Sequence, residues 1–388
     1  MPVKILLIVG DASNVFSYNY AKWIKQSMEC QIDVFDFYPT NSRAEEQLCF
    51  DNVYSAKESP SFYRRRYFRD SLFHSFKKRE LQKFLKGRKY DIIHCHWLIS
   101  PLVLCADEIK LHCDKLFATF WGGELTQWKV LLSQNLYLKR LKNFLGKVDF
   151  VINSQASELS FVKQFPCIKD KYRYGTLGAV GLDHLADYLA NSSRDISKQY
   201  FELPKEKISV MIGYSGKEIH QHIPIIEQIG QYKENTDNLH LLLPMTRDAS
   251  PLYIDKVRLA LDKIGISYTL LSNRFLSDQE IAILRHSTDI VLQLSRFDGF
   301  SRSILEAFCA RSLVIYGNWL GYEAHMKVAG LKGIEVDSIE AGITALFKNK
   351  DSLNIFDSIL TTNSQKVLEN NKWENCIKSW VEIYKSSL

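Results

Sequence analysis

Short apolar runs alternate with longer amphipathic stretches along the first half of the chain. Five runs bounded by polar or turn residues predict buried strands: Val3–Val9, Ile32–Phe37, Asp91–Cys95, Leu116–Phe120 and Phe150–Asn153. Four stretches with helical spacing of apolar side chains separate them: Tyr18–Met28, Pro101–His112, Trp128–Leu145 and Gln155–Phe165. Because parallel strands need crossover connections, this alternation predicts a parallel sheet covered by helices on both faces.

The same alternation restarts after a polar stretch at 191–206, which has the composition of a linker. The strands predicted in the second half are Ile208–Ile212, Leu239–Leu243, Tyr268–Leu271, Asp289–Leu294 and Leu313–Ile315. The helices predicted between them are Ile223–Lys233, Tyr253–Ile264, Asp278–His286 and Ser303–Ala310. We therefore predict two doubly wound α/β domains at 1–190 and 207–362, and a C-terminal helix at 363–388 that packs back on the first domain.

Length and composition agree with two globular domains. The 388 residues exceed one ordinary core, and 46% are hydrophobic against 24% charged. No secretory signal and no run of about 20 apolar residues is visible, so we expect a cytoplasmic protein that is soluble or peripheral. The cysteines form no C-x-x-C pair and predict free thiols in a reducing compartment: Cys30, Cys49, Cys95, Cys105, Cys113, Cys167, Cys309 and Cys376.

Positive charge is concentrated in one segment. The net charge is +6, but residues 64–89 hold eleven Lys or Arg against two acids, a local charge of +9. Aromatic side chains alternate with these cations over 62–89, a pattern suited to an anionic membrane surface. The alternative is a solvated helix face with core aromatics. Nucleic-acid binding is disfavoured, because no recognition fold accompanies the segment.

The segment from Arg296 to Ala307 offers the most informative chemistry. Asp298 follows a predicted strand, Gly299 allows a tight turn, and Ser301 or Ser303 can cap the next helix. Glu306 lies eight residues after Asp298, on the first turns of that helix. Backbone N–H groups at a helix N-terminus suit a diphosphate, and two carboxylates can accept hydrogen bonds from sugar and ribose hydroxyls. The alternative is a surface turn followed by a helical glutamate.

This segment resembles the E-x7-E motif of GT-B glycosyltransferases, particularly the retaining family 4. The form E-G-F-G-x-x-x-x-E-A is matched by Asp298-Gly299-Phe300-Ser301 and Glu306-Ala307 at unchanged spacing. The resemblance implies two Rossmann-like domains that face each other across a cleft. It also implies that Asp298 contacts the transferred sugar and Glu306 the ribose, although aspartate reaches one methylene less far than the family's glutamate.

Two segments of the first half resemble the same family. Asp91-Ile-Ile-His94-Cys-His96 is similar to its D-h-h-H-x-H strand end, and Trp121-Gly122-Gly123-Glu124 to its W-G-x-D/E turn, for which a plain turn is the alternative. A catalytically important histidine occupies this loop in many relatives, and Trp121 replaces it here. The resemblance therefore leaves His94, His96 or Glu124 to organise the acceptor hydroxyl, while Gly10 and Asp11 line the cleft. Two histidines without a third ligand predict no metal site.

A glycine-bounded loop follows the first strand of the second half. Relatives place an Arg and a Lys here to neutralise the donor diphosphate, but Tyr214 stands at the Arg position. The G-x-S-G form with a nearby histidine is more similar to the fucosamine-type transferases. The candidate donor-binding residues are Gly213, Ser215, Gly216, Lys217, His220, Arg247 and Arg296, together with Gly299, Phe300 and Ser301.

The resemblance implies hexosyl transfer from a nucleoside diphosphate-sugar, with UDP or GDP, in bacterial surface polysaccharide assembly. The acceptor would be a glycan or a polyprenyl-diphosphate-linked glycan at the inner face of the plasma membrane. Family 4 implies retention at the anomeric carbon, whereas the fucosamine-type loop implies inversion; no cofactor is expected. The alternatives are a non-catalytic scaffold subunit and a nucleotide-sugar epimerase. A dehydrogenase is disfavoured, because no G-x-G-x-x-G follows either first strand.

Overall fold

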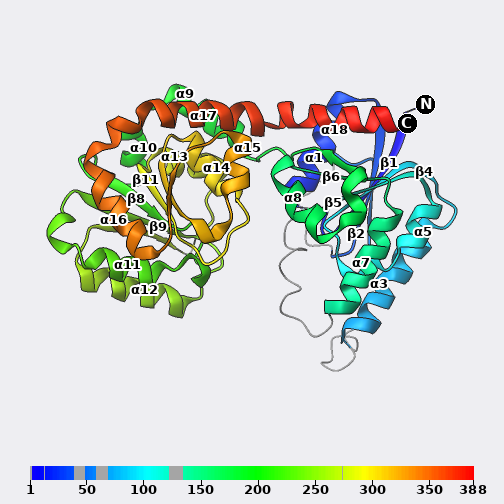
Figure 1. Ribbon diagram of the computed structural model, residues 1–388, viewed down its shortest axis with the longest axis horizontal. Helices are drawn as coiled ribbons and strands as arrows, with labels where there is room; N and C mark the ends of the chain where they lie inside the picture. The colour runs from blue at the N-terminus through cyan, green and yellow to red at the C-terminus, as the bar shows by residue number, and fades with distance from the viewer. Residues whose placement is uncertain (1, 13, 39–48, 58–68, 122–133, 273) are drawn as a thin grey trace. The chain divides into compact units, whose positions relative to one another are not determined.

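The chain folds into two compact α/β units (Figure 1). The structure is a computed structural model that describes residues 2–12, 14–38, 49–57, 69–121, 134–272 and 274–388. The first unit comprises Met1–Gly178 and Trp373–Leu388, and the second comprises Ala179–Lys372. All eight cysteines are free thiols.

A seven-stranded parallel sheet forms the centre of the first unit, in the order β3-β2-β1-β4-β5-β6-β7. Its strands are β1 (Val3–Val9), β2 (Cys30–Asp36), β3 (Asn52–Ser55), β4 (Tyr90–His96), β5 (Cys113–Thr119), β6 (Phe150–Asn153) and β7 (Tyr172–Tyr174). Its α-helices are α1 (Val15–Ser27), α3 (Arg69–Leu85), α4 (Ser100–Val103), α5 (Ala106–Leu111), α7 (Gln134–Lys147), α8 (Gln155–Gln164) and α18 (Trp373–Ser387), with a 3-10 helix at Pro166–Lys171.

The central strands of this sheet are buried on both faces. Residues 5–9 of β1 are at most 2% exposed, and Ile5 pairs with Ile32 of β2 and Ile92 of β4. The helices α3, α5 and α7 contribute to the core on one face, while α1 and α18 pack against each other on the other. Continuous apolar strands of this kind are typical of parallel sheets.

The second unit is built on a six-stranded parallel sheet in the order β10-β9-β8-β11-β12-β13. Its strands are β8 (Ile208–Ile212), β9 (Leu239–Met245), β10 (Tyr268–Ser272), β11 (Ile290–Gln293), β12 (Leu313–Gly317) and β13 (Ile334–Val336). Its α-helices are α9 (Leu182–Asn191), α10 (Arg194–Tyr200), α11 (His222–Gly230), α12 (Pro251–Ile264), α13 (Asp278–His286), α14 (Arg302–Cys309), α15 (Glu323–Ala329), α16 (Ile339–Asn349) and α17 (Asp357–Asn371). The 3-10 helices of this unit are Glu218–His220, Lys233–Asn235, Asn318–Leu320 and Lys350–Phe356.

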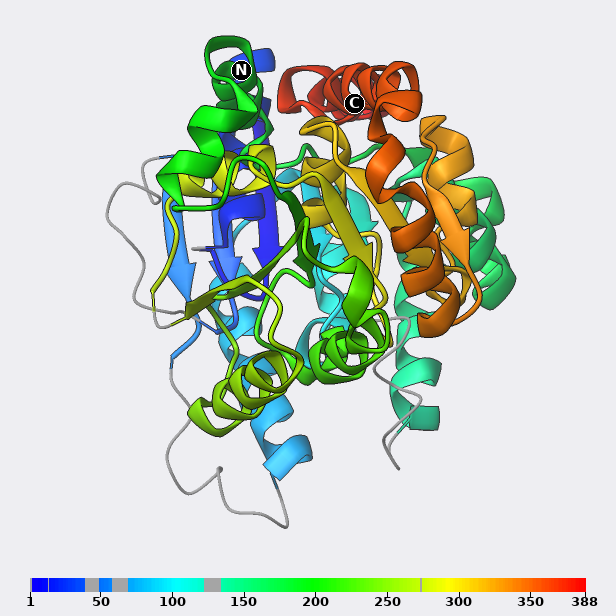
Figure 2. The same cartoon turned by 90° about the vertical axis from the view of Figure 1, so that its left-hand side faces the viewer.

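Two separate apolar cores cover the faces of the second sheet. On one face α11, α12 and α16 pack over alternate strand residues such as Val210 and Ile212, and α11 lies beside α12 (Figure 2). On the other face α9, α13, α14 and α17 pack around Met211 (Figure 1). The period of two along β8 thus assigns successive side chains to opposite cores.

The segment expected as a linker is instead folded into the second unit. The structure differs from the sequence-based boundaries here, because 179–190 carries α9 and the stretch 191–206 contains α10. Arg194 of α10 donates to Asp289 (2.7 Å) and to the Ala310 carbonyl (2.8 Å), and Lys198 lies 2.8 Å from the second Asp289 oxygen. Burial would raise the pKa of Asp289, but Arg194 and Lys198 outweigh it and hold this pKa below its usual value.

Candidate functional site

The loops that follow β8, β11 and β12 meet at one carboxylate, Asp298, which is 6% exposed. One of its oxygens accepts a hydrogen bond from the Tyr214 hydroxyl. The other accepts from the Tyr322 hydroxyl and from the Ser301 N–H, the latter at 2.9 Å. The carboxyl ends of neighbouring parallel strands share one sheet edge, so residues distant in the sequence converge there.

Both tyrosines remain protonated donors. Burial, followed by the negative charge of Asp298, raises the pKa of Tyr214 and of Tyr322 far above that of an exposed phenol. A carboxylate has about four acceptor positions, of which three are used here. Asp298 therefore retains room for about one further donor, such as a sugar hydroxyl, while it fixes the loop.

Asp298 also determines the start of α14. Ser301 is the N-cap residue, but its side chain makes no capping hydrogen bond, and the Asp298 carboxylate receives the Ser301 N–H instead. Phe300 has φ of +59°, a left-handed value that is strained for a bulky residue. Its ring stacks on His325 (centroids 4.8 Å apart) and contacts Tyr322, which stabilises this backbone. Gly299 has open space around its Cα.

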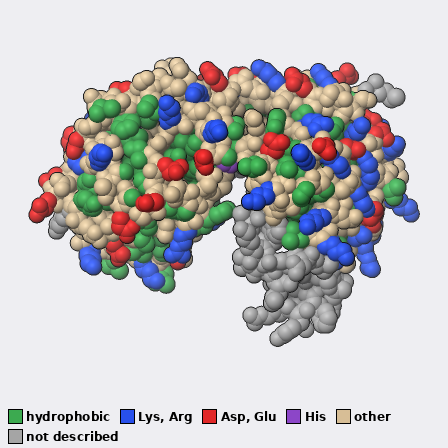
Figure 3. Space-filling model, viewed as in Figure 1, with side chains coloured by type: hydrophobic (Ala, Val, Ile, Leu, Met, Phe, Trp, Pro, Cys, Tyr) green, Lys and Arg blue, Asp and Glu red, His purple; other side chains and the backbone are tan. Residues whose placement is uncertain are grey.

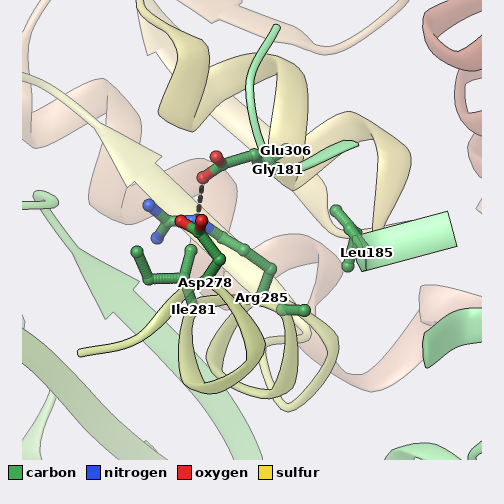
Figure 4. Close-up of a pocket in the computed structure, with 7 residues that line it drawn as sticks. Gly181, Leu185, Asp278, Ile281, Arg285 and Glu306 are labelled. Atoms are coloured by element: carbon green, nitrogen blue, oxygen red, sulfur yellow. Dashed lines mark hydrogen bonds and ion pairs between the residues drawn. The ribbon is translucent and has the colours of Figure 1, made fainter. Parts of the chain in front are cut away.

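Glu306 lies on α14 and is 2% exposed, with both oxygens paired to arginines. Arg285 Nε of α13 lies 2.9 Å from one oxygen, and Arg302 Nε lies 2.9 Å from the other. Figure 4 shows the Arg285 guanidinium directed at the Glu306 carboxylate within a narrow pocket. This pocket is also lined by Gly181, Leu185, Asp278, Ile281 and Ala282. Two cations therefore neutralise the carboxylate.

Neither arginine was among the residues singled out from the sequence. Arg302 had a local signal, because it precedes Glu306 by four residues on one helix and such pairs meet on the helix surface. Arg285 had none, because its contact with Glu306 joins two helices 21 residues apart along the chain. Packing of α13 against α14 creates this ion pair.

The glycine loop after β8 is tightly packed. Gly213 has φ of +67°, and a Cβ there would come within 2.9 Å of His220. A Cβ on Gly216 would lie 2.1 Å from that of Ala249, and the Gly216 N–H already donates to the Arg247 carbonyl (2.8 Å). Glycine is thus required at both positions by close approach of the chain.

His220 contributes a hydrogen bond but no charge near neutral pH. Its Nε2 lies 3.0 Å from the Ser215 hydroxyl, and both residues are buried. Burial lowers the pKa of His220 to about 4. The cations at this edge are Lys217, which lies 3.5 Å from Asp248, and the exposed Arg247 and Arg296.

In the first unit, His94 is held by the protein's own groups on both ring nitrogens. Its Nε2 lies 2.9 Å from the Thr119 hydroxyl, which itself donates to the Ile152 carbonyl. A hydroxyl has one proton, so His94 Nε2 carries the hydrogen and donates to Thr119. Nδ1 therefore accepts from the Tyr384 hydroxyl at 2.6 Å. Burial lowers the pKa of His94 well below its usual value, so the ring is neutral.

His96 lies at the carboxyl end of β4 among aromatic rings. It is 1% exposed, and burial lowers its pKa to about 3. Within the described part of the chain its Nε2 has no hydrogen-bond partner. Trp97 stacks on Trp121 with centroids 6.3 Å apart, and Trp97 also covers Gly10, where a Cβ would clash at 2.3 Å.

The remaining first-unit candidates are only partly placed. Asp11 is half-buried in the loop after β1. Gly122, Gly123 and Glu124 lie outside the described residues, so their contribution stays a prediction. Over the ranges that the structure describes, no group of three His, Cys, Asp or Glu could hold a metal ion. Among the described helices, none is long and apolar enough to cross a membrane.

The basic segment is described from residue 69, with side chains from 74. Leu81, Phe84 and Leu85 of α3 are buried in the first unit's core. The exposed cations of this region are Arg79, Lys83, Lys86, Arg88 and Lys89. Lys and Arg side chains line the edge of the first unit where α3 lies (Figure 3). Leu81, Phe84 and Leu85 therefore belong to the fold, whereas these five cations face solvent and Lys77 is buried.

Comparison with known proteins gives structural similarity without sequence similarity. No model of a known protein family matches the chain, and no curated protein matches its sequence. Sucrose-phosphate synthase from Thermosynechococcus elongatus superposes with a TM-score of 0.74 at 14% identity, covering 99% of this chain and 98% of that one. A glycosyltransferase from Rickettsia africae gives 0.71 at 14% identity, covering 100% and 98%.

A third similar structure is the Anabaena protein HepE in complex with UDP and glucose. Its TM-score is 0.69 at 14% identity, with 99% of this chain and 100% of that chain covered. Such low identities establish the fold alone. Similarity over the whole chain, together with two parallel sheets wrapped by helices, confirms the α/β architecture predicted from the sequence: the chain has the GT-B fold.

Proposed function

We propose that the protein is a glycosyltransferase that moves a hexosyl group from a nucleoside diphosphate-sugar to a glycan or lipid-linked glycan. The observation that carries this proposal is the convergence of three loops on Asp298 at the start of α14, with Glu306 on the same helix. This arrangement combines a helix N-terminus, nearby cations and buried carboxylates, which suits a diphosphate joined to a sugar. HepE, which has the same fold, was solved with UDP and glucose.

In this proposal the second unit binds the donor. The N-terminus of α14 and the cations Lys217, Arg247 and Arg296 stabilise the diphosphate as negative charge develops on it. The remaining acceptor position of Asp298 accepts a hydrogen bond from a sugar hydroxyl. Glu306 accepts a hydrogen bond from a ribose hydroxyl, which replaces one of its arginine contacts. Catalysis then rests on positioning and electrostatic stabilisation rather than on a covalent cofactor.

The acceptor belongs to the first unit in this proposal. His96 is neutral over the physiological pH range, and its unpaired Nε2 is suited to organise an acceptor hydroxyl. We propose retention of the anomeric configuration, following the family 4 resemblance of the segment from Asp298 to Glu306, and a role in surface polysaccharide assembly. Proton NMR of the product formed in the first minutes tests the configuration, and an inverted product would contradict it.

Donor hydrolysis by the purified protein tests the proposed function. UDP-glucose and GDP-mannose are incubated without acceptor, and release of the nucleoside diphosphate is measured. Glu306→Gln keeps the side-chain shape but removes the charge, so hydrolysis is expected to fall at least tenfold. Glu340→Gln, on an exposed position of α16, is the matched control and should leave the rate unchanged.

A second candidate is a non-catalytic scaffold subunit with a glycosyltransferase fold. It is favoured by one observation, namely that Glu306 is paired to two arginines and Asp298 to two tyrosines. A scaffold would neither hydrolyse nor bind any nucleotide sugar. Hydrolysis that is lost in Glu306→Gln and kept in Glu340→Gln excludes it.

We also propose peripheral attachment of the first unit to anionic membranes through residues 62–89. The exposed cations on and after α3 support this, since each basic residue near such a surface contributes about 1 kcal/mol. Flotation with phosphatidylglycerol vesicles should recover the wild type, and the double variant Lys83→Glu, Lys86→Glu should float less. Recovery that is equal for both proteins, or absent for the wild type, would contradict attachment through this segment.

A further inference from the structure

Trp319, in the loop after β12, is held in a fixed orientation. Its indole N–H donates to the Ser295 carbonyl at 2.7 Å. Its six-membered ring covers Gly317, where a Cβ would come within 2.3 to 2.5 Å of the indole carbons. The ring therefore needs a glycine beneath it, and the hydrogen bond prevents it from turning away.

The same ring is also accessible to solvent. Trp319 is 38% exposed, more than any other tryptophan whose side chain the structure describes. A tryptophan that only fills a core is normally more deeply buried. A fixed ring with a free face loses little conformational entropy when a ligand stacks on it, so the geometry suits binding.

Trp319 is bonded to the loop that carries the carboxylate assigned to the donor sugar. Its bond to Ser295 connects the loop after β12 to the loop that carries Asp298. Tyr322, three residues further on, makes a second connection by donating to Asp298. Both bonds join the loops that follow two neighbouring strands, since β11 pairs with β12. The indole and the Asp298 carboxylate thus belong to two loops that are joined by two hydrogen bonds.

The position of Trp319 along the sheet edge indicates which part of the donor it contacts. Glu306 is paired with Arg285 on α13, and the proposed function assigns Glu306 to the ribose. Trp319 lies in the loop after β12, next in strand order after β11, and its hydrogen bond is to the loop of Asp298. A pyranose presents C–H groups on one face, and the electron-rich face of an indole attracts such positively polarised edges.

We propose that Trp319 is a stacking platform for the sugar ring of the donor. The inference rests on the proposed function, because it takes the nucleotide to be bound at this edge. It assigns Trp319 to the sugar and not to the nucleotide, so removal of the ring should affect nucleotide sugars while leaving nucleoside diphosphates unaffected.

Calorimetric titration with UDP and UDP-glucose, and in parallel with GDP and GDP-mannose, tests the platform. In Trp319→Leu the ratio of nucleotide-sugar to nucleotide affinity should fall about fivefold, as expected for loss of one ring contact. Trp319→Phe keeps a ring but loses the bond to Ser295, and should retain most of the ratio. Gly317→Ala keeps the indole but displaces it, and should resemble Trp319→Leu. Trp23→Leu, on α1 of the first unit, is the matched control.

The outcomes separate the platform from the proposed function. If Trp319→Leu keeps the wild-type ratio, or if Trp319→Phe loses as much as Trp319→Leu, the ring does not stack on the sugar and the platform is overturned while donor binding stands. If the wild type binds neither nucleotide and neither nucleotide sugar, the proposed function fails and the platform fails with it. The platform is supported if the ratio of nucleotide-sugar to nucleotide affinity falls in Trp319→Leu and Gly317→Ala but not in Trp319→Phe and Trp23→Leu.

Discussion

The carboxyl edges of the two sheets carry different chemistry. In the first unit His94 and His96 are buried, neutral and surrounded by aromatic rings. In the second unit the buried groups are the carboxylates Asp298 and Glu306, with arginines and lysines nearby. In the proposed function, the second edge takes the charged diphosphate and the first edge takes an uncharged hydroxyl. Two units of similar topology thus differ in the side chains that their loops carry.

We expect Glu306→Ala to cause the largest loss of stability, and so to test the contrast between the two units most strongly. The change leaves Arg285 buried without its carboxylate, which typically costs about 3 to 5 kcal/mol of unfolding free energy. Urea denaturation followed by circular dichroism measures it. The exposed Glu340→Ala should stay within about 0.5 kcal/mol.

A paired substitution separates the charge from the packing. Arg285→Leu combined with Glu306→Leu removes both buried charges at similar volume and should recover most of the loss. If Glu306→Ala is as stable as the wild type, the ion pair does not organise the second edge, and the contrast between the two units is wrong in this respect.

A smaller loss of stability is expected from His94→Leu in the first unit. The change removes the group that donates a hydrogen bond to the Thr119 hydroxyl and the group that accepts one from the Tyr384 hydroxyl. Each of these buried hydroxyls is left with one partner fewer. Each such group costs about 1 to 3 kcal/mol, offset by the added apolar side chain, so we expect about 2 kcal/mol. Thermal unfolding measures it, with the exposed His184→Leu as control. Equal melting temperatures for the two variants would show that His94 does not brace the first unit.

Acid should lower the free energy of unfolding through the buried histidines of both units. Burial lowers the pKa of His96 to about 3 and of His220 to about 4, whereas an unfolded histidine titrates near 6.5. Between these values the unfolded chain binds more protons, so stability present at neutral pH falls as the pH drops. Each histidine contributes up to about 1.4 kcal/mol per pH unit.

The buried Asp36 carboxyl has the opposite effect on the pH dependence of stability. Burial raises the pKa of Asp36 to about 6, so its folded form takes up a proton before the unfolded form does. Denaturant midpoints measured from pH 7 to pH 4.5 should still fall, because more histidines than raised carboxyls titrate here. His220→Asn should flatten the slope, and an unchanged slope in this variant would show that His220 is not the neutral group described.

Much of the fold could be predicted from the sequence because the interior strands are apolar. Val3–Val9, Phe150–Asn153 and Ile208–Ile212 were predicted with the bounds that the structure has. The edge strands β3, β7 and β13 were missed, since they are short or polar and are held by backbone pairing to one neighbour. The helix α10 was also missed, because its sequence is polar and its ion pairs with Asp289 join residues far apart along the chain.

The candidate site was predictable only where its residues are close in the sequence. The spacing of Asp298 and Glu306 singled out the loop and helix that the structure brings to one sheet edge. The partners of these carboxylates come from elsewhere: Tyr214 is 84 residues away from Asp298, and Tyr322 is 24. Such contacts depend on strand order, which a local pattern does not determine.

The central claim is that a nucleotide binds at the carboxyl edge of the second sheet. Hydrogen exchange of backbone amides, measured with and without UDP or GDP, tests it most directly. We expect slower exchange at 213–217 and 299–306 when the effective nucleotide is added, and no comparable change in the loops after β1 and β4. Unchanged exchange at both of these second-unit segments, or protection confined to the first unit, would contradict the account.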